Sequence, residues 1–349
     1  MMPFIWFLLI LLCLLLYVTL DGYDLGLGIA TLFERDPGQR RQLVELVAPA
    51  WDGNETWLVL LAVSLWAGLP LAYGTILPHA YLAVIVMLLA LIVRGVSVEI
   101  ASQNPPAPGW VRAFGVGSLI AALMQGVVVS TLAASLPLTD GAFSGSTFGA
   151  FGWFSALAAA TVAAGYLALG HAYTKWKTTG EVRAKAGRRG FAAAVVAAVL
   201  GAASLGAVNA TAAPLNLSGP SRAAGFAWLL AFAVAGVAMT LVTIRPGSRF
   251  DGLPLAGLVI ATVAGVLALV VARYPLLAPP SLTVDAAASP GTTMDFLAVG
   301  VGLNVPLLLF YTYYAHYAFR GKQLGTPEAV IPPARGGAPR PTPEPLHEH

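Results

Sequence analysis

The chain carries, from Pro3 to Leu20, the uncharged run Pro-Phe-Ile-Trp-Phe-Leu-Leu-Ile-Leu-Leu-Cys-Leu-Leu-Leu-Tyr-Val-Thr-Leu, and continues directly with Asp21-Gly-Tyr-Asp24. A helix needs about 20 mainly apolar residues to cross the hydrocarbon core of a bilayer, so this run predicts a membrane span. An ionised aspartate at the centre of such a helix costs about 3 kcal/mol by insertion scales, and it is tolerated only where it faces protein, water or a proton route. The two aspartates therefore predict a functional site inside a membrane fold.

The composition of the whole chain supports a membrane protein. Of its 349 residues, 58% are hydrophobic and only 10% are charged, whereas about 25% charged residues are usual in soluble domains. The only cysteine, Cys13, lies in the first apolar run, which excludes a disulfide framework. We predict an all-α polytopic protein with nine transmembrane helices, at approximately 4–30, 49–70, 75–98, 110–136, 149–173, 190–209, 223–244, 253–272 and 296–319.

The basic residues indicate how these helices are oriented. With nine spans, the two ends of the chain lie on opposite sides of the membrane. If the N-terminus is outside, all of the 19 lysines and arginines except Arg222 and Arg273 fall at the inner ends of spans, in inner loops or in the tail. Cytoplasmic loops carry such an excess of positive charge. The sequence therefore predicts an outside N-terminus and a cytoplasmic C-terminus.

The chain reads as one membrane domain with a short extension. We predict a single nine-helix domain over residues 1–324 and a disordered cytoplasmic tail over residues 325–349, because the tail is rich in Pro, Gly and Ala. Spans five to eight are dominated by small and aliphatic residues, which lets helices approach closely in lipid. Gly22 and Gly26 have the spacing of a close helix contact. Most of the chain therefore looks like scaffold, and the chemistry is expected in the first three spans.

The polar residues of the first three spans form a candidate site. Residues three apart share a face of a helix, so Asp21 can point with Asp24, and Asp52 with Glu55. Arg94 would be a natural countercharge. The predicted orientation places these groups and Glu99 at similar depth near the cytoplasmic side, which suits a proton uptake path.

Simpler interpretations exist for several of these residues. Asp52 follows Pro49 and could serve only to cap the N-terminus of its helix, where a carboxylate is favoured. Arg94 and Glu99 could be an ordinary pair at the membrane surface. The histidines argue against a metal site, because none are paired at helical spacing within a span: His79, His171, His316, His347 and His349.

Several motifs together resemble subunit II of the cytochrome bd-type quinol oxidases. They are the Asp21-Gly-Tyr-Asp-Leu-Gly-Leu-Gly28 helix end, the stretch Ala48-Pro-Ala-Trp-Asp-Gly-Asn-Glu-Thr-Trp57, the stretch Leu69-Pro-Leu-Ala-Tyr73, and Arg94-Gly-Val. The Glu-Thr-Trp ending is similar to the cyanide-insensitive branch. The resemblance covers about residues 15–100, and beyond that point it consists mainly of the number of spans and a tyrosine-rich last span.

The resemblance implies a partner and an activity. Such a complex, in the bacterial inner membrane, oxidises quinol and reduces O2 to water with protons taken from the cytoplasm. Its haem b and haem d groups are held mainly by subunit I, with which this chain would form a heterodimer in contact with lipid and quinol. The resemblance leaves room for a small accessory subunit, and it implies no nucleic-acid partner.

The resemblance also assigns roles to residues. It implies the proton-route aspartate at Asp52, the acidic pair of the first helix at Asp21 and Asp24, and the arginine of the third span at Arg94. Glu99 is added to this predicted site from its depth near the cytoplasmic side. Trp51 and Asn54, in the same motif, are expected near the partner or a quinone. No residue is expected to bind a metal.

Two other classes of protein remain as alternatives. A proton-coupled transporter would also use acids inside the membrane, but transporters usually show an internal repeat and helices broken near the midplane. We find no repeat, and the acids lie near one mouth of the bundle. A purely structural assembly partner would leave Asp21 and Asp52 without a role.

Overall fold

The structure, a computed structural model, describes residues 2–103, 107–133, 136–139, 142–146, 148–208, 211, 215–279 and 281–322. The predicted tail at 325–349, with His347 and His349, lies outside the described residues. Its disorder and the domain boundary at residue 324 therefore stay predictions.

Eight helices in the described part of the chain are long and apolar enough to cross a membrane. They have at least 21 residues each, which corresponds to about 32 Å or more at 1.5 Å per residue. The prediction of a helical multi-pass membrane protein is confirmed. The eight are α1 (Met2–Phe33), α4 (Pro70–Gln103), α5 (Pro108–Ala133), α6 (Trp153–Lys177), α7 (Gly180–Val208), α8 (Pro220–Thr243), α9 (Leu253–Arg273) and α11 (Gly291–Ala318).

The predicted second span corresponds to the shorter helix α3 (Trp51–Gly68), which is not among the eight. Its 18 residues are about 27 Å long, but polar residues in its first turns (Asp52, Asn54 and Glu55) reduce its mean hydropathy. The amphipathic helix α2 (Pro37–Val47) precedes α3, and only Leu69 separates α3 from α4. The number of nine spans and the orientation of the two termini therefore stay predictions.

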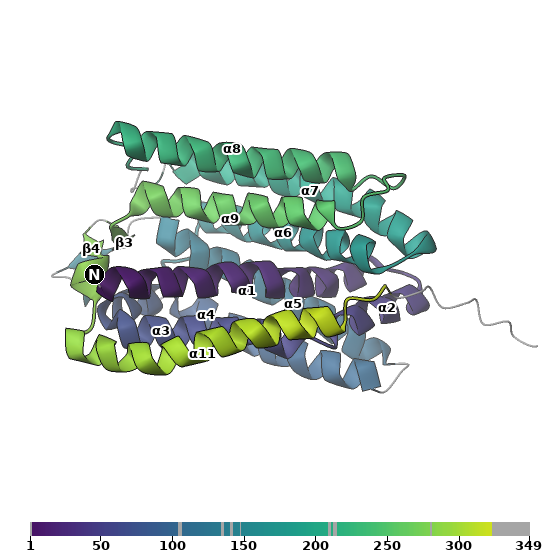
Figure 1. Ribbon diagram of the computed structural model, residues 1–349, viewed down its shortest axis with the longest axis horizontal. Coiled ribbons are helices and arrows are strands. Elements are labelled where there is room, and N and C mark those ends of the chain that lie inside the picture. The colour runs from purple at the N-terminus through teal and green to yellow at the C-terminus, as the bar shows by residue number, and fades with distance from the viewer. Residues whose placement is uncertain are drawn as a thin grey trace, which may run out of the picture.

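Helix α1 lies in the middle of the bundle, where it packs against α3, α5 and α6. The other main contacts join α4 to α5, α5 to α6, α6 to α7, and α8 to α9. In Figure 1, helices α7, α8 and α9 lie on one side of α1, and α3, α4 and α11 lie on the other. The polar end of α1 is consequently covered by other helices of the same chain.

Glycines allow α1 and α6 to cross at close range. A Cβ atom on Gly26 would overlap the backbone of Tyr166, and a Cβ on Gly170 would overlap the backbone of Gly26. A Cβ on Gly22 would lie 2.8 Å from the ring of Tyr166. The close packing predicted from the spacing of Gly22 and Gly26 is therefore confirmed.

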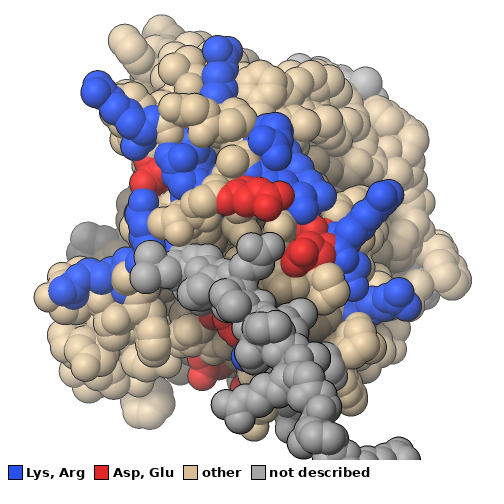
Figure 2. Space-filling model, turned by 90° about the vertical axis from the view of Figure 1, so that its right-hand side faces the viewer, with Lys and Arg blue, Asp and Glu red and all other residues tan. Residues whose placement is uncertain are grey.

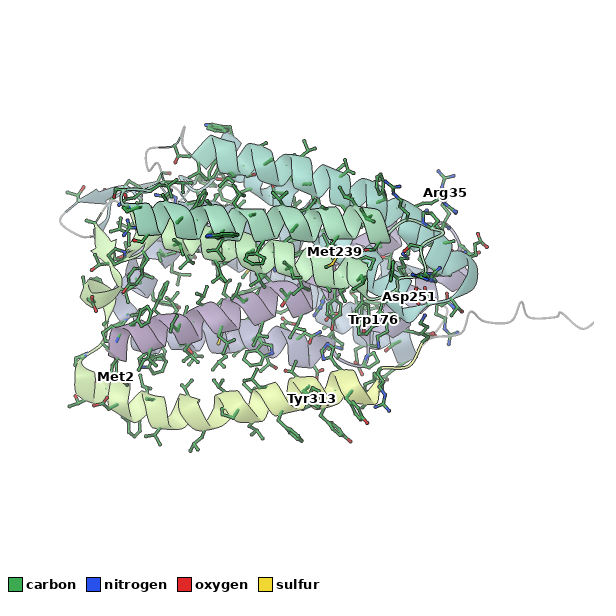
Figure 3. All side chains as sticks on the ribbon, turned by 45° about the horizontal axis from the view of Figure 1, so that its top comes forward. Met2, Arg35, Trp176, Met239, Asp251 and Tyr313 are labelled. Atoms are coloured by element: carbon green, nitrogen blue, oxygen red, sulfur yellow. The ribbon has the colours of Figure 1, made fainter. Side chains whose placement is uncertain are left out.

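The two ends of the bundle differ. One end carries two short antiparallel hairpins and the one-turn helix α10 (Val284–Ala287). The other end, where α1, α6 and α11 finish, carries many lysines and arginines, as Figure 2 shows, and we call it the basic end. In Figure 3, Arg35 and Asp251 mark the basic end and Met2 marks the opposite end. The hairpins pair β1 (Leu138–Thr139) with β2 (Ala142–Phe143), and β3 (Leu276–Ala278) with β4 (Leu282–Thr283).

Candidate functional site

The guanidinium of Arg94, on α4, is the centre of a buried polar cluster. Its Nη2 lies 2.6 Å from Oδ1 of Asp21 and 3.7 Å from Oδ2 of Asp24, both on α1. Its Nη1 lies 3.2 Å from Oε2 of Glu55 on α3. One cation from α4 therefore holds carboxylates from two other helices. We call Asp21, Asp24, Glu55 and Arg94 the acid cluster.

The local sequence allows Trp51 to cover this cluster. The Trp51 ring centre lies 5.4 Å from Cζ of Arg94, within the range of a cation–π interaction. Gly95 makes room for the ring, because a Cβ atom at this position would lie 2.9 Å from Cζ3 of Trp51. The Trp51 motif at the start of α3 and the Arg94-Gly motif on α4 thus fit together in space.

A chain of hydrogen bonds connects the acid cluster to the last helix. The amide nitrogen of Asn54 donates to Oδ2 of Asp24 and to the hydroxyl of Tyr23, each at 2.8 Å. The Tyr23 hydroxyl lies 2.7 Å from Nε2 of His316, and Nδ1 of His316 lies 2.8 Å from the carbonyl oxygen of Thr312. A carbonyl can only accept, so Nδ1 of His316 donates to Thr312, and in the neutral imidazole Nε2 then accepts from the hydroxyl of Tyr23.

The charges of the acid cluster are not balanced. Three carboxylates surround one guanidinium, and buried charges are costly unless they are paired. Oδ1 of Asp24 is buried and has no hydrogen-bond partner among the described residues. The arrangement is therefore suited to hold protons on its carboxylates and to release them.

The members of the acid cluster differ in their access to solvent. The side chains of Asp21 and Asp24 are 0% and 1% exposed, whereas that of Glu55 is 24% exposed. Glu55 is consequently the one carboxylate of the acid cluster that solvent can reach directly.

The structure brings together only some of the predicted site residues. Asp21, Asp24 and Arg94 are in contact, but the suggested pair of Arg94 with Glu99 is wrong. Glu99 is exposed and instead accepts a hydrogen bond from Gln103 on the same helix.

Asp52 lies at the surface and makes only a local contact. Its Oδ1 accepts a hydrogen bond from the backbone N–H of Gly53 at 2.8 Å. The N-cap of α3 is Ala50, so the suggestion that Asp52 caps this helix is wrong in its detail. A carboxylate in the first turn is still favoured by the helix dipole.

Trp51 and Asn54, predicted near the partner or a quinone, both touch the acid cluster instead. The two N–H donors of the Asn54 amide are engaged by Asp24 and Tyr23, which leaves no donor for a quinone oxygen. Their predicted cofactor role stays a prediction.

The sequence does not identify Tyr23 and His316 as residues of the site. Tyr23 lies inside the quoted Asp21–Gly28 motif, and His316 lies in the last turn of the final span. The predicted topology places both at the same side of the membrane, which is the one signal for their contact.

The fold and the acid cluster define a helical membrane protein with a buried cluster of charged side chains. A family model described as "Cytochrome bd terminal oxidase subunit II" matches residues 2–319. The chain belongs to this family, and it is a multi-pass protein of the bacterial inner membrane.

Relatives agree with this assignment, and a solved structure has the same fold. Subunit 2 of the cytochrome bd-I ubiquinol oxidase of Escherichia coli (strain K12) is 26% identical over 366 residues, covering 91% of this chain and 94% of that protein. Subunit 2 of the cytochrome bd ubiquinol oxidase of Bacillus subtilis (strain 168) is 34% identical over 139 residues, covering 38% of this chain and 41% of that protein. The bd oxidase structure from Geobacillus thermodenitrificans matches with a TM-score of 0.73 and 15% identity, covering 91% of this chain and 98% of that chain, which shows the fold.

Proposed function

We propose that this chain is the subunit of a membrane quinol oxidase that supports a haem-bearing subunit I and supplies a proton path from the cytoplasm. Cytochrome bd oxidases oxidise quinol and reduce O2, and forming water from O2 consumes protons. The family assignment disfavours the alternative of a proton-coupled transporter. The observation that carries the proposal is the acid cluster, in which three carboxylates share the guanidinium of Arg94.

The exposure of the acids suggests the order of proton transfer. Asp52 is exposed at the start of α3, and Glu55 follows three residues later on the same face of the helix. Glu55 is partly exposed and touches Arg94, which also binds Asp21. A proton would pass from Asp52 to Glu55 and then to the buried pair Asp21 and Asp24. The predicted orientation puts Asp52 on the cytoplasmic side.

The histidines in the described part of the chain do not fit a haem site. Both ring nitrogens of His316 are engaged, by Tyr23 and by Thr312. His79 lies on α4 and His171 on α6, and they are near opposite ends of the bundle. We therefore assign haem b and haem d to the partner subunit, together with the redox chemistry. A heterodimer with subunit I, with or without a small accessory subunit, follows from this division.

Glu55→Gln tests the proton path in the purified complex. The substitution keeps the shape of the side chain but removes its titratable proton, so quinol-driven oxygen uptake should fall by about 10²-fold with normal haem content. Glu55→Asp should recover part of the activity. Glu181→Gln, which changes an exposed acid of α7 at the same end, should leave uptake unchanged. Full activity of a haem-loaded Glu55→Gln complex would contradict the path.

A further inference from the structure

A cavity of about 290 Å³ opens at the basic end of the bundle. It lies between α2, α6 and the end of α11, and its wall includes Leu46, Tyr173, Lys177 and Phe319. The cavity is separate from the acid cluster, although His316 lines it and is hydrogen-bonded to Tyr23. Its lining combines apolar surface with positive charge.

Lys177 is a buried cation in this wall. It is 4% exposed, and its ammonium donates a hydrogen bond of 2.7 Å to the carbonyl oxygen of Phe319. The ammonium also lies 4.7 Å from the ring centre of Trp176. No carboxylate of the described residues forms an ion pair with Lys177. An ammonium has three N–H donors, so two of them remain for a ligand.

The other charged groups of the wall already have partners. Glu45 forms an ion pair of 2.6 Å with Arg41, and Lys322 forms one with Asp251. Both ring nitrogens of His316 are hydrogen-bonded. Among the described residues, Lys177 therefore has a carbonyl oxygen and two aromatic rings as partners but no carboxylate, and a buried charge without a counter-ion is unfavourable. An anionic ligand in the cavity would supply the missing countercharge.

We propose that this cavity binds the phosphate-bearing headgroup of an anionic phospholipid, with Lys177 as its counter-ion. The cavity lies at the ends of membrane-crossing helices, where headgroups are located, and basic pockets between such helices bind anionic headgroups. Trp176 and Tyr173 beside Lys177 are typical of the membrane–water interface. The apolar side chains of Leu46, Ala315 and Phe319 suit the glycerol and the first acyl carbons.

Lipid binding to the full chain tests this site. The chain, purified with its associated subunits and delipidated, is titrated with short-chain phosphatidylglycerol and followed by native mass spectrometry. Lys177→Met keeps an unbranched side chain against Trp176 but removes the charge, so affinity should fall by about tenfold or more. Lys177→Arg should retain binding. Arg188→Met removes an exposed charge of α7 at the same end and should change affinity less than about twofold.

A variant that fills the cavity tests whether the lipid binds inside it. Ala318→Trp should abolish binding with Lys177 intact, and this variant carries the test if Lys177→Met does not fold. Unchanged binding to Ala318→Trp would overturn the proposal. An equal loss in Arg188→Met would show general attraction to the basic end and would also overturn it. Complete displacement of the lipid by an equal concentration of inorganic phosphate would show a free-anion site instead.

Discussion

The hydroxyl of Tyr23 lies 2.7 Å from Nε2 of His316, although 293 residues separate the two in the sequence. The Tyr23 ring also stacks on Tyr173 of α6, with 4.2 Å between ring centres. Helix α11 is mostly exposed, and only Met294 and Val305 are buried in it. The contact between Tyr23 and His316 therefore gives this peripheral helix a polar connection to the acid cluster.

Tyr23→Phe should destabilise the complex. The substitution removes the hydroxyl that donates to His316 and accepts from Asn54, and leaving buried polar groups unsatisfied costs about 1–3 kcal/mol. The midpoint of thermal denaturation should fall. Tyr313→Phe is the matched control, because Tyr313 lies on α11 and is 67% exposed. Equal midpoints for the two variants would show that the hydrogen bond contributes nothing measurable.

Asp52→Asn distinguishes a proton role from an effect on the helix terminus. Asn keeps the shape of Asp but cannot carry the proton, and the lost interaction of the carboxylate with the helix dipole costs only about 0.3–1 kcal/mol. If Asp52 is the outer acid of the path, oxygen uptake should fall on the order of 10²-fold while haem content stays normal, and Asp52→Glu should recover part of it. A haem-loaded Asn variant with normal quinol-driven uptake would leave only the structural role.

Glu34 should make stability depend on pH. This residue follows α1 and is 3% exposed, and its burial alone would raise its pKa. The hydrogen bonds and charges of Lys185 and Arg189 and the backbone N–H of Asp36 stabilise the carboxylate more strongly. The pKa of Glu34 is therefore lowered below the ordinary 4.5. A lowered pKa in the folded state adds stability above the ordinary value, and this stability is lost as pH falls through the folded-state pKa.

Glu34→Gln should therefore lower the thermal midpoint at pH 7. Its difference from the unaltered protein should shrink as the pH is brought below 4.5. Thermal denaturation in detergent at a series of pH values measures this difference. Glu181→Gln, which changes an exposed acid on α7, should show no such trend, and a pH-independent difference for Glu34→Gln would contradict the ion-pair explanation.

Gly26→Ala should prevent normal packing of α1 on α6, because the added Cβ would overlap the backbone of Tyr166. Gly165→Ala, on α6, is the matched control: a Cβ there meets nothing within 4 Å, and alanine is favoured over glycine inside a helix by about 0.5–1 kcal/mol. The yield of folded complex by size-exclusion chromatography compares them. Similar yields would mean that the crossing can relax.

Hydrophobic runs predict most of the helices because a span of lipid length is a strong signal. The spacing of Asp21 and Asp24 alone predicts that they share one face of α1. The prediction for Glu99 fails because five residues turn a helix by about 140°, so Glu99 cannot share the buried face of Arg94. The contacts of Glu55 with Arg94 and of His316 with Tyr23 depend on how separate helices rotate and pack, and no local pattern determines this.

The origin of the acid cluster in distant segments has a consequence for biosynthesis. The partner of Asp21, Arg94, is 73 residues further along the chain, and His316 is made much later still. During translation, α1 is therefore made before the cation that pairs with its aspartates, and each unpaired charge costs at most the roughly 2.5–3.5 kcal/mol of a charge at a helix centre. Protonation or delayed lateral release of α1 would lower this cost until α4 arrives. The order of synthesis thus makes α11 the last helix to pack on the bundle. A nascent chain arrested before α11 would contain both Asp21 and Arg94 but would lack His316, the partner of Tyr23.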